Sequence, residues 1–180
     1  MAPVIVARDL YKCYAGFPPV LRGVNIEVQA GELVAIMGPS GCGKSNMLHV
    51  LGMLHAPDAG TLHILDTDVL AFTREQTAAF RRGNMGFVMQ SSNLFEHSTV
   101  FENVAFAMEV FGYDKVQIQK RVLEVLDLVG LKNKVRQYPT QLSGGEQQRV
   151  VIARAIVKNP SIITTFFLGI ASAPNPRTLR

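Results

Sequence analysis

The sequence contains few cysteines, no tryptophan and no long uncharged apolar run. Of its 180 residues two are cysteines, Cys13 and Cys42, which form no CxxC pair. A disulfide framework is therefore excluded, and a reducing compartment is expected. No stretch of about 18 apolar residues is present, so no membrane-spanning helix is expected. The start of the chain also lacks the basic and apolar regions of a secretory signal peptide.

Acidic residues are absent from the C-terminal end of the chain. The formal net charge is +4, from 18 basic and 14 acidic residues, but every acid lies at or before Glu146. Residues 147–180 carry five basic residues and no acid. The positive balance thus comes from an acid-free tail and not from a cluster of lysine and arginine, so a nucleic-acid partner is not expected.

Hydrophobic patterning predicts a single α/β domain. The 180 residues, 48% of them hydrophobic, are enough for one core and short for two. Alternation over residues 24–29 predicts a half-buried strand, and the continuous apolar run 33–37 predicts a fully buried one. Further strands are expected over 61–65, 85–89 and 161–167, and helices over 44–54, 99–112, 118–130 and 145–157. Strands early and late with helices between them indicate an α/β fold with a helical insertion.

Residues 38–45 read GPSGCGKS and match the phosphate-binding P-loop pattern G-x-x-x-x-G-K-[ST]. The expected buried strand precedes this loop, and an expected helix follows it. Glycines let backbone N–H groups turn toward phosphate oxygens, and the N-terminus of the helix adds positive potential. Lys44 is placed to reach the β- and γ-phosphates of a nucleotide, and Ser45 to bind Mg²⁺. The loop alone does not determine which nucleotide binds.

A second motif, LSGGE, occupies residues 142–146. Ser143 and Glu146 have the spacing of a capping box, so Gly144 and Gly145 lie at the start of a helix with N–H groups free to face an anion. Alone, this pattern is typical of an ordinary capped helix. With a P-loop about 100 residues upstream, an anion-binding role becomes the better interpretation.

Together these motifs resemble those of the ATPase subunits of ABC transporters. The P-loop, Gln90 after the run MGFVM, and LSGGE followed by QQR stand in the order and spacing of that family. The resemblance covers roughly residues 3–163, and it is strongest to the branch that serves lipoprotein release, macrolide export and cell division.

The resemblance implies an α/β fold of the P-loop NTPase (RecA-like) type. In such a fold an N-terminal antiparallel β portion and an inserted helical subdomain accompany the core, and here the C-terminal part is expected to be incomplete. The chain would form one nucleotide-binding domain, with its core in 1–90 and 151–167, its helical subdomain in about 91–150, and an atypical tail in 168–180.

ATP and Mg²⁺ are the ligands that the resemblance implies. Tyr14 stands where the family stacks an aromatic ring on adenine, and Gln90 stands where it contacts Mg²⁺ or the attacking water. Ser45 and Gln90 are the implied magnesium ligands, and Gln90 is the implied catalytic residue. The implied nucleotide-binding residues are Tyr14, Gly38, Ser40, Gly41, Gly43, Lys44, Ser45 and Asn46, with Ser143, Gly144 and Gly145 acting on ATP bound to another protomer.

Partners are also implied by the resemblance. The family closes as a head-to-tail pair, so the chain is expected to form a homodimer or a dimer with a second ATPase subunit. Residues near 92–100 are expected to receive the coupling helices of a membrane-embedded permease subunit. The chain would then be cytoplasmic and peripheral, on the cytoplasmic face of the inner (plasma) membrane. The permease selects the transported substrate, so this sequence does not identify it.

The sequence departs from the family where the Walker B carboxylates are expected. Counting from Leu142 places the Asp and Glu of the family at Phe166 and Phe167, and phenylalanine can neither support Mg²⁺ nor deprotonate water. The histidine that contacts the γ-phosphate is also missing, because all four histidines (His49, His55, His63 and His97) lie upstream. Loss of a general base costs about 10²–10⁴-fold, so the chain is expected to lack ATP hydrolysis.

Agreement with the family stops abruptly after residue 163. Gradual sequence divergence would scatter the differences from the family along the chain. A change at one point instead favours a truncated or frame-shifted product, with an inactive paralogue as the alternative. A tail that leaves a parallel sheet poorly covered also predicts a chain that is marginally folded or poorly soluble alone. A smaller departure is Asn46, where the family usually has threonine beside the α-phosphate, and weakened nucleotide binding is expected from it.

Two other classes of function remain open from the sequence. One is a P-loop GTPase or kinase of another class. A GTPase would carry Asn-Lys-x-Asp, but the run 133–136 reads NKVR. The DxxG pattern at 127–130 lies at the end of an expected amphipathic helix and is better explained as a helix stop. The other alternative is a non-catalytic interaction protein that keeps the shape of the ATPase and occupies the permease. Binding of ATP separates this last possibility from an ATP-binding subunit.

Overall fold

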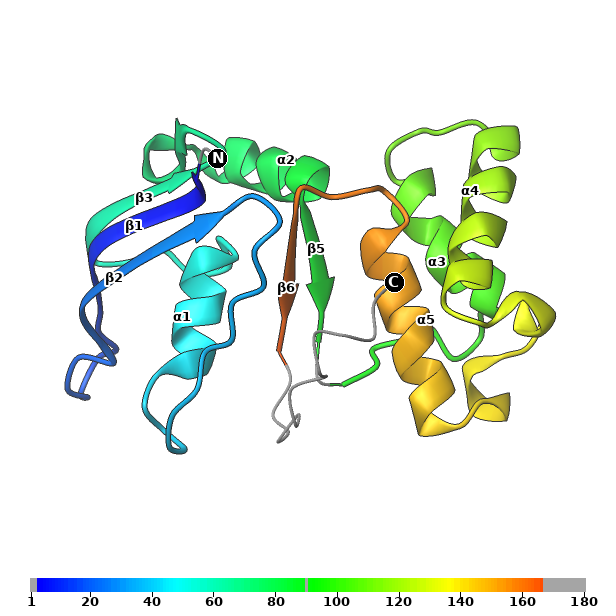
Figure 1. The fold of residues 1–180 in the computed structure, drawn as a ribbon, viewed down its shortest axis with the longest axis horizontal. Helices are drawn as coiled ribbons and strands as arrows, with labels where there is room; N and C mark the ends of the chain where they lie inside the picture. Colours follow the sequence, from blue (N-terminus) through cyan, green and yellow to red (C-terminus); the bar gives the residue numbers. More distant parts are fainter. Residues whose placement is uncertain (1–2, 90, 167–180) are drawn as a thin grey trace.

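The computed structural model describes residues 3–89 and 91–166, which form an antiparallel sheet, a short parallel sheet and a group of helices (Figure 1). The antiparallel sheet has the strand order β2-β1-β3-β4. Its strands are β1 (Pro3–Lys12), β2 (Leu21–Gln29), β3 (Ala59–Ile64) and β4 (Thr67–Asp68). The alternating segment 24–29 lies within β2, as its pattern predicts.

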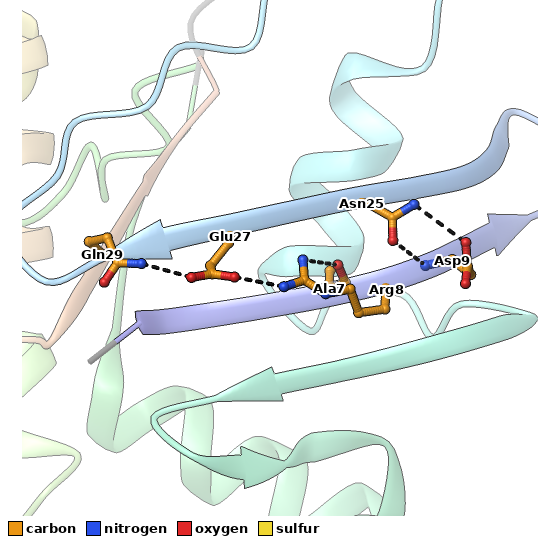
Figure 2. Close-up of polar contacts among 6 residues, drawn as sticks. All are labelled: Ala7, Arg8, Asp9, Asn25, Glu27 and Gln29. Carbon is orange, nitrogen blue, oxygen red and sulfur yellow. Dashed lines mark hydrogen bonds and ion pairs between the residues drawn. The ribbon is translucent and has the colours of Figure 1, made fainter. Parts of the chain in front are cut away.

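Polar side chains join β1 to β2 on an exposed face of this sheet (Figure 2). An Nη2 atom of Arg8 lies 2.6 Å from Oε2 of Glu27, and Gln29 donates to the same carboxylate at 2.9 Å. The register shifts between Ala7 and Leu10, where Asp9 has a φ of 48° and its N–H donates to Asn25 at 3.1 Å. These bonds hold the bulge, and the exposed ion pair adds only about 0–1 kcal/mol.

Helix α1 (Lys44–Leu51) packs between the antiparallel sheet and the parallel pair β5 (Met85–Val88) and β6 (Ile162–Thr165). One apolar cluster joins them, with buried side chains from β1, α1, β3, β5 and β6. Helix α2 (Arg74–Asn84), absent from the sequence prediction, precedes β5 and begins with a Thr73–Gln76 capping box. The described chain therefore places α1 between the two sheets (Figure 1).

Three helices form the other half of the molecule: α3 (Val100–Glu109), α4 (Lys115–Leu128) and α5 (Gly144–Ile156). They lie between β5 and β6 in the chain, as the predicted helical insertion requires, and they enclose a second apolar cluster. Helix α5 also packs on β5, where a Cβ on Gly86 would lie 2.6 Å from the Ala155 carbonyl oxygen. Short 3-10 turns occupy η1 (Val69–Ala71), η2 (Lys132–Lys134) and η3 (Pro139–Gln141).

The predicted buried strand over residues 33–37 is wrong. The segment forms no strand, and Leu33 and Met37 are 90% and 88% exposed. A strand of a parallel sheet is buried only when neighbouring strands and helices cover it. In the part of the chain that the structure describes, β5 and β6 pair with each other and no third strand joins them. An apolar run alone is therefore not sufficient to place this segment in the sheet.

Candidate functional site

The P-loop of residues 38–43 leads directly into α1, which begins at Lys44. Gly43 has a φ of 96°, and a Cβ there would lie 2.6 Å from the carbonyl oxygen of Val20. Any larger residue would both strain the backbone and collide with the chain before β2. This glycine therefore fixes how closely the loop approaches the antiparallel sheet.

The first turn of α1 differs from those of the longer helices that the structure describes. Helices α2 to α5 each begin with a capping box, whereas α1 has no side-chain cap at Gly43. Its first N–H groups are orphan donors of the kind that bind anions. The ammonium of Lys44 folds over the loop and donates to the carbonyl oxygens of Gly38 and Pro39 at 2.8 and 2.7 Å. A positive charge and free donors thus meet at one loop.

Tyr14 lies against the same helix. Its hydroxyl donates to Oδ1 of Asn46 at 2.8 Å and lies 3.0 Å from Nδ1 of His55. The ammonium of Lys12 lies 5.5 Å from the centre of the Tyr14 ring, within the range of a cation–π contact. The fold therefore brings Tyr14, the residue expected to stack on adenine, next to the first turn of α1, which follows the P-loop.

Asp58 fixes the segment that carries Tyr14. Its carboxylate accepts from the backbone N–H of Cys13 at 2.6 Å and from Lys12 Nζ at 2.9 Å. The bond from Cys13, followed by that from Lys12, lowers the pKa of Asp58. The turn after α1 and the end of β1 are thereby tied together, which holds Tyr14 beside α1.

The end of β6 leads to Phe166, the residue that the count from Leu142 assigns to the first expected Walker B carboxylate. Phe166 is 9% exposed, and its N–H donates to the carbonyl oxygen of Val88 at 2.9 Å. Its ring centre lies 5.0 Å from that of His49 on α1. Burial, and then the nearby His55, lower the pKa of His49. Gln90 and Phe167, the other expected residues of this region, lie outside the described residues.

The LSGGE motif forms the capping box that its spacing predicts. Ser143 accepts from the N–H of Glu146 at 3.3 Å, and Glu146 accepts from the N–H of Ser143 at 2.9 Å. The backbone of Ser143 and then the ammonium of Lys134 lower the pKa of Glu146 to about 2. A Cβ on Gly144 would meet nothing within 4 Å, so this helix start is open to an incoming group.

Residues 92–100, the expected permease-contact block, lead into the start of α3 and are held by buried groups. The carboxamide of Asn103, which is fully buried, bonds the backbone of Phe95, Ser98 and Thr99 at 2.8–3.1 Å. Arg154 on α5 donates to the carbonyl oxygens of Asn93 and Ser92 at 2.9 and 3.2 Å. The ring of Phe95 packs edge-on against Phe106 at 5.0 Å, and both remain 46% exposed. An ordered surface with exposed aromatic rings results.

The predicted site residues thus form two groups. Tyr14, Asn46, Lys44 and Phe166 gather around α1, whereas LSGGE lies beyond β5 and β6 at the start of α5 (Figure 1). Within one chain the two groups remain apart. The residues that the sequence analysis missed are His55 and Asp58, which no motif marks because only the fold brings them beside Tyr14.

Known proteins resemble the chain over most of its length. The family model described as "ABC transporter" matches residues 21–165. The cell division ATP-binding protein FtsE of Streptococcus pneumoniae is 46% identical over 160 residues, which are 89% of this chain and 69% of that protein. The lipoprotein-releasing system ATP-binding protein LolD of Cytophaga hutchinsonii is 39% identical over 163 residues, which are 91% of this chain and 74% of that protein.

A solved structure agrees with the fold. The dimeric post-hydrolysis structure of the ATP-binding cassette MJ0796, bound to ADP and Pi, matches with a TM-score of 0.78 and 36% identity, over 88% of this chain and 72% of that one. This confirms the predicted P-loop NTPase fold with its antiparallel sheet and helical insertion. Among the described residues, no helix is long and apolar enough to cross a membrane. The chain therefore belongs to the ABC transporter family, as an ATPase subunit of the branch that contains FtsE and LolD.

Proposed function

We propose that this chain binds Mg-ATP at its P-loop as the ATP-binding subunit of an ABC complex, and that as written it does not hydrolyse ATP. The single observation that carries the binding proposal is the geometry around α1. An uncapped helix start, the Lys44 ammonium and the Tyr14 ring lie together there. This set of groups suits the phosphates and the base of one nucleotide.

Each group has a distinct contribution to ATP binding. Free N–H groups of the loop and of the first turn of α1 donate to phosphate oxygens, and Lys44 exchanges its carbonyl partners for the β- and γ-phosphates. Tyr14 stacks on adenine. Asn46 donates from its amide to the α-phosphate, where threonine would use a hydroxyl.

The donor set also fits a magnesium ion in part. Ser45 is exposed in the first turn of α1, and its hydroxyl is the kind of hard oxygen ligand that Mg²⁺ prefers. When bound, the ion would neutralise charge on the β- and γ-phosphates. Phe166 offers no oxygen, so it cannot hydrogen-bond and orient the ligands of the ion as a carboxylate would. We expect Mg²⁺ to enter with ATP rather than to bind the protein alone.

The absence of hydrolysis follows from the end of β6. The buried Phe166 ring packs on His49 and supplies neither a ligand nor a base. Phe167 stands at the position of the glutamate that orients the attacking water in the family. Without that base the attacking water is not activated, and bound ATP persists.

The same proposal extends to partners. LSGGE lies away from the P-loop of its own chain, which supports a head-to-tail pair in which Ser143, Gly144 and Gly145 contact ATP bound to the other protomer. The exposed Phe95 and Phe106 rings near residues 92–100 suit an apolar coupling helix of a permease subunit. These contacts would place the chain on the cytoplasmic face of the membrane.

Titration with Mg-ATP tests this function. Calorimetry on the chain and on Lys44→Ala should show at least a tenfold weaker affinity in the variant, because a charge-assisted contact is lost. Equal affinities would overturn the P-loop assignment. Phosphate release should match the rate without protein, and turnover that disappears in Lys44→Ala would show that another residue supplies the base. No binding of ATP at all would favour the non-catalytic interaction protein.

A further inference from the structure

We infer that His55, acting with Asn46, is a positioning residue that holds the Tyr14 ring for adenine. The inference rests on the proposed ATP-binding function and adds a specific device to it. Three side chains from separate segments make this device: Tyr14 from the end of β1, Asn46 from α1, and His55 from the turn after α1. These three side chains form the Tyr14 clamp.

The chemistry of the three groups determines the direction of each hydrogen bond. Oδ1 of Asn46 can only accept, so the Tyr14 hydroxyl uses its one proton in the 2.8 Å bond to it. The phenol oxygen must then accept in its 3.0 Å contact with Nδ1 of His55. His55 therefore carries a proton on Nδ1. The Nδ2 group of Asn46 stays available as a donor to phosphate.

His55 is itself held in place by the end of α1. The backbone N–H of His55 donates to the carbonyl oxygen of His49 at 3.2 Å, and the centres of the two imidazole rings lie 4.9 Å apart. Three residues further on, the carboxylate of Asp58 accepts from the backbone N–H of Cys13 and from the ammonium of Lys12, the two residues that precede Tyr14. The phenol end and the backbone end of the tyrosine are thus both fixed from the same turn.

A fixed ring favours stacking because ordering a free side chain opposes binding. Tyr14 is only half-buried, so without its hydroxyl contacts it would sample several rotamers. The Tyr14 clamp also links the base-binding ring to Asn46, in the turn that faces the α-phosphate.

Two substitutions at position 55 separate positioning from bulk structure. His55→Leu removes the donor, whereas His55→Asn places an amide N–H near the position of Nδ1 and should restore the bond. His55 is exposed, so both variants should keep the fold, which circular dichroism checks. Tripolyphosphate is the matched ligand, because it engages the P-loop but has no base to stack.

Calorimetric titrations with Mg-ATP and with magnesium tripolyphosphate test the inference. Loss of one hydrogen bond should weaken Mg-ATP about three- to tenfold in His55→Leu, leave tripolyphosphate unchanged, and be largely restored in His55→Asn. In Tyr14→Phe, where the clamp is already broken, adding His55→Leu should change little. Unchanged ATP affinity in His55→Leu, or an equal loss for both ligands, overturns the inference. Lys44→Ala is the separate control: if it weakens neither ligand, the proposed function fails instead.

Discussion

The helical half of this molecule and the segment around its P-loop share one chain but differ in how they are stabilised. Helices α3, α4 and α5 each begin with a complete capping box and enclose a common apolar cluster. The segment 32–38 before the P-loop has no regular structure, and Leu33 and Met37 project from it. Local sequence signals determine the first region, whereas an apolar run such as 33–37 becomes a buried strand only where neighbouring strands and helices cover it.

The candidate site residues are divided between the same two regions. The helical half presents two preformed surfaces, LSGGE and the Phe95–Phe106 face. The P-loop half instead gathers its groups by long-range hydrogen bonds through Tyr14 and Asp58. We therefore expect the helical half to be the more stable part and the P-loop segment to be the part that responds to ligand.

The largest contrast is between two leucines. Leu126 in α4 is fully buried, whereas Leu33 is 90% exposed. Leu126→Ala should lower the free energy of unfolding by about 2–5 kcal/mol, because it removes packed methyl groups and leaves a cavity. Leu33→Ser should change it by less than about 0.5 kcal/mol. Urea denaturation followed by circular dichroism measures both. A large loss for Leu33→Ser would mean that residues 33–37 are packed in solution.

Asn103 provides the next effect. Its buried carboxamide bonds the backbone of the turn before α3, so Asn103→Ala leaves several groups unpaired. The variant should lose about 1–3 kcal/mol of stability, with faster amide exchange over 95–98. Glu109→Ala, on an exposed position of the same helix, is the matched control and should change little. Equal effects of the two substitutions would remove Asn103 from this account.

A helix cap should have a smaller effect. Thr99 accepts from the N–H of Glu102 at 3.2 Å at the start of α3. Thr99→Ala should cost about 1 kcal/mol, while Thr99→Ser keeps the hydroxyl and most of the stability. Thermal melts of the three proteins give the comparison. If serine failed to rescue the cap, the threonine methyl group and not the hydrogen bond would be the stabilising feature.

The smallest effect is a dependence on pH. The pKa of Glu146 is lowered from 4.5 to about 2 in the folded chain. Between these values the unfolded chain binds more protons, so the contribution of Glu146 to stability is complete above pH 4.5 and is lost as the pH falls toward 2. Glu146→Gln keeps a capping partner but cannot titrate. Its stability should therefore fall less than that of the parent over this range in acid denaturation. If the stability of the two proteins fell equally with pH, the lowered pKa of Glu146 would be contradicted.

The sequence predicted the helical half well because its signals are local. The three helices appear within a few residues of their expected limits, as periodicity and capping residues place them. Helix α2 was missed because its residues are mostly polar, although Thr73 and Gln76 carry a capping-box signal. The strand over 33–37 was predicted wrongly, since burial of an apolar run depends on partners that the run does not encode.

The candidate site was also predictable only in part. The P-loop spacing identified Lys44, and resemblance to the family identified Tyr14. His55 and Asp58 could not be found, because their contacts with residues 12–14 exist only after β1, α1 and β3 have packed together. Whether Gln90 acts in catalysis remains a prediction, since it lies outside the described residues.

Hydrogen–deuterium exchange can show whether the P-loop of this chain binds ATP although the segment before it lacks strand partners in the described chain. Peptides covering 33–46 should exchange fast without ligand and become protected with saturating Mg-ATP, while α4 and α5 stay protected throughout. Lys44→Ala should abolish the change in 33–46 and leave the helices unaffected. Exchange over 33–46 that does not respond to Mg-ATP, in a chain whose helices are protected, would contradict the account.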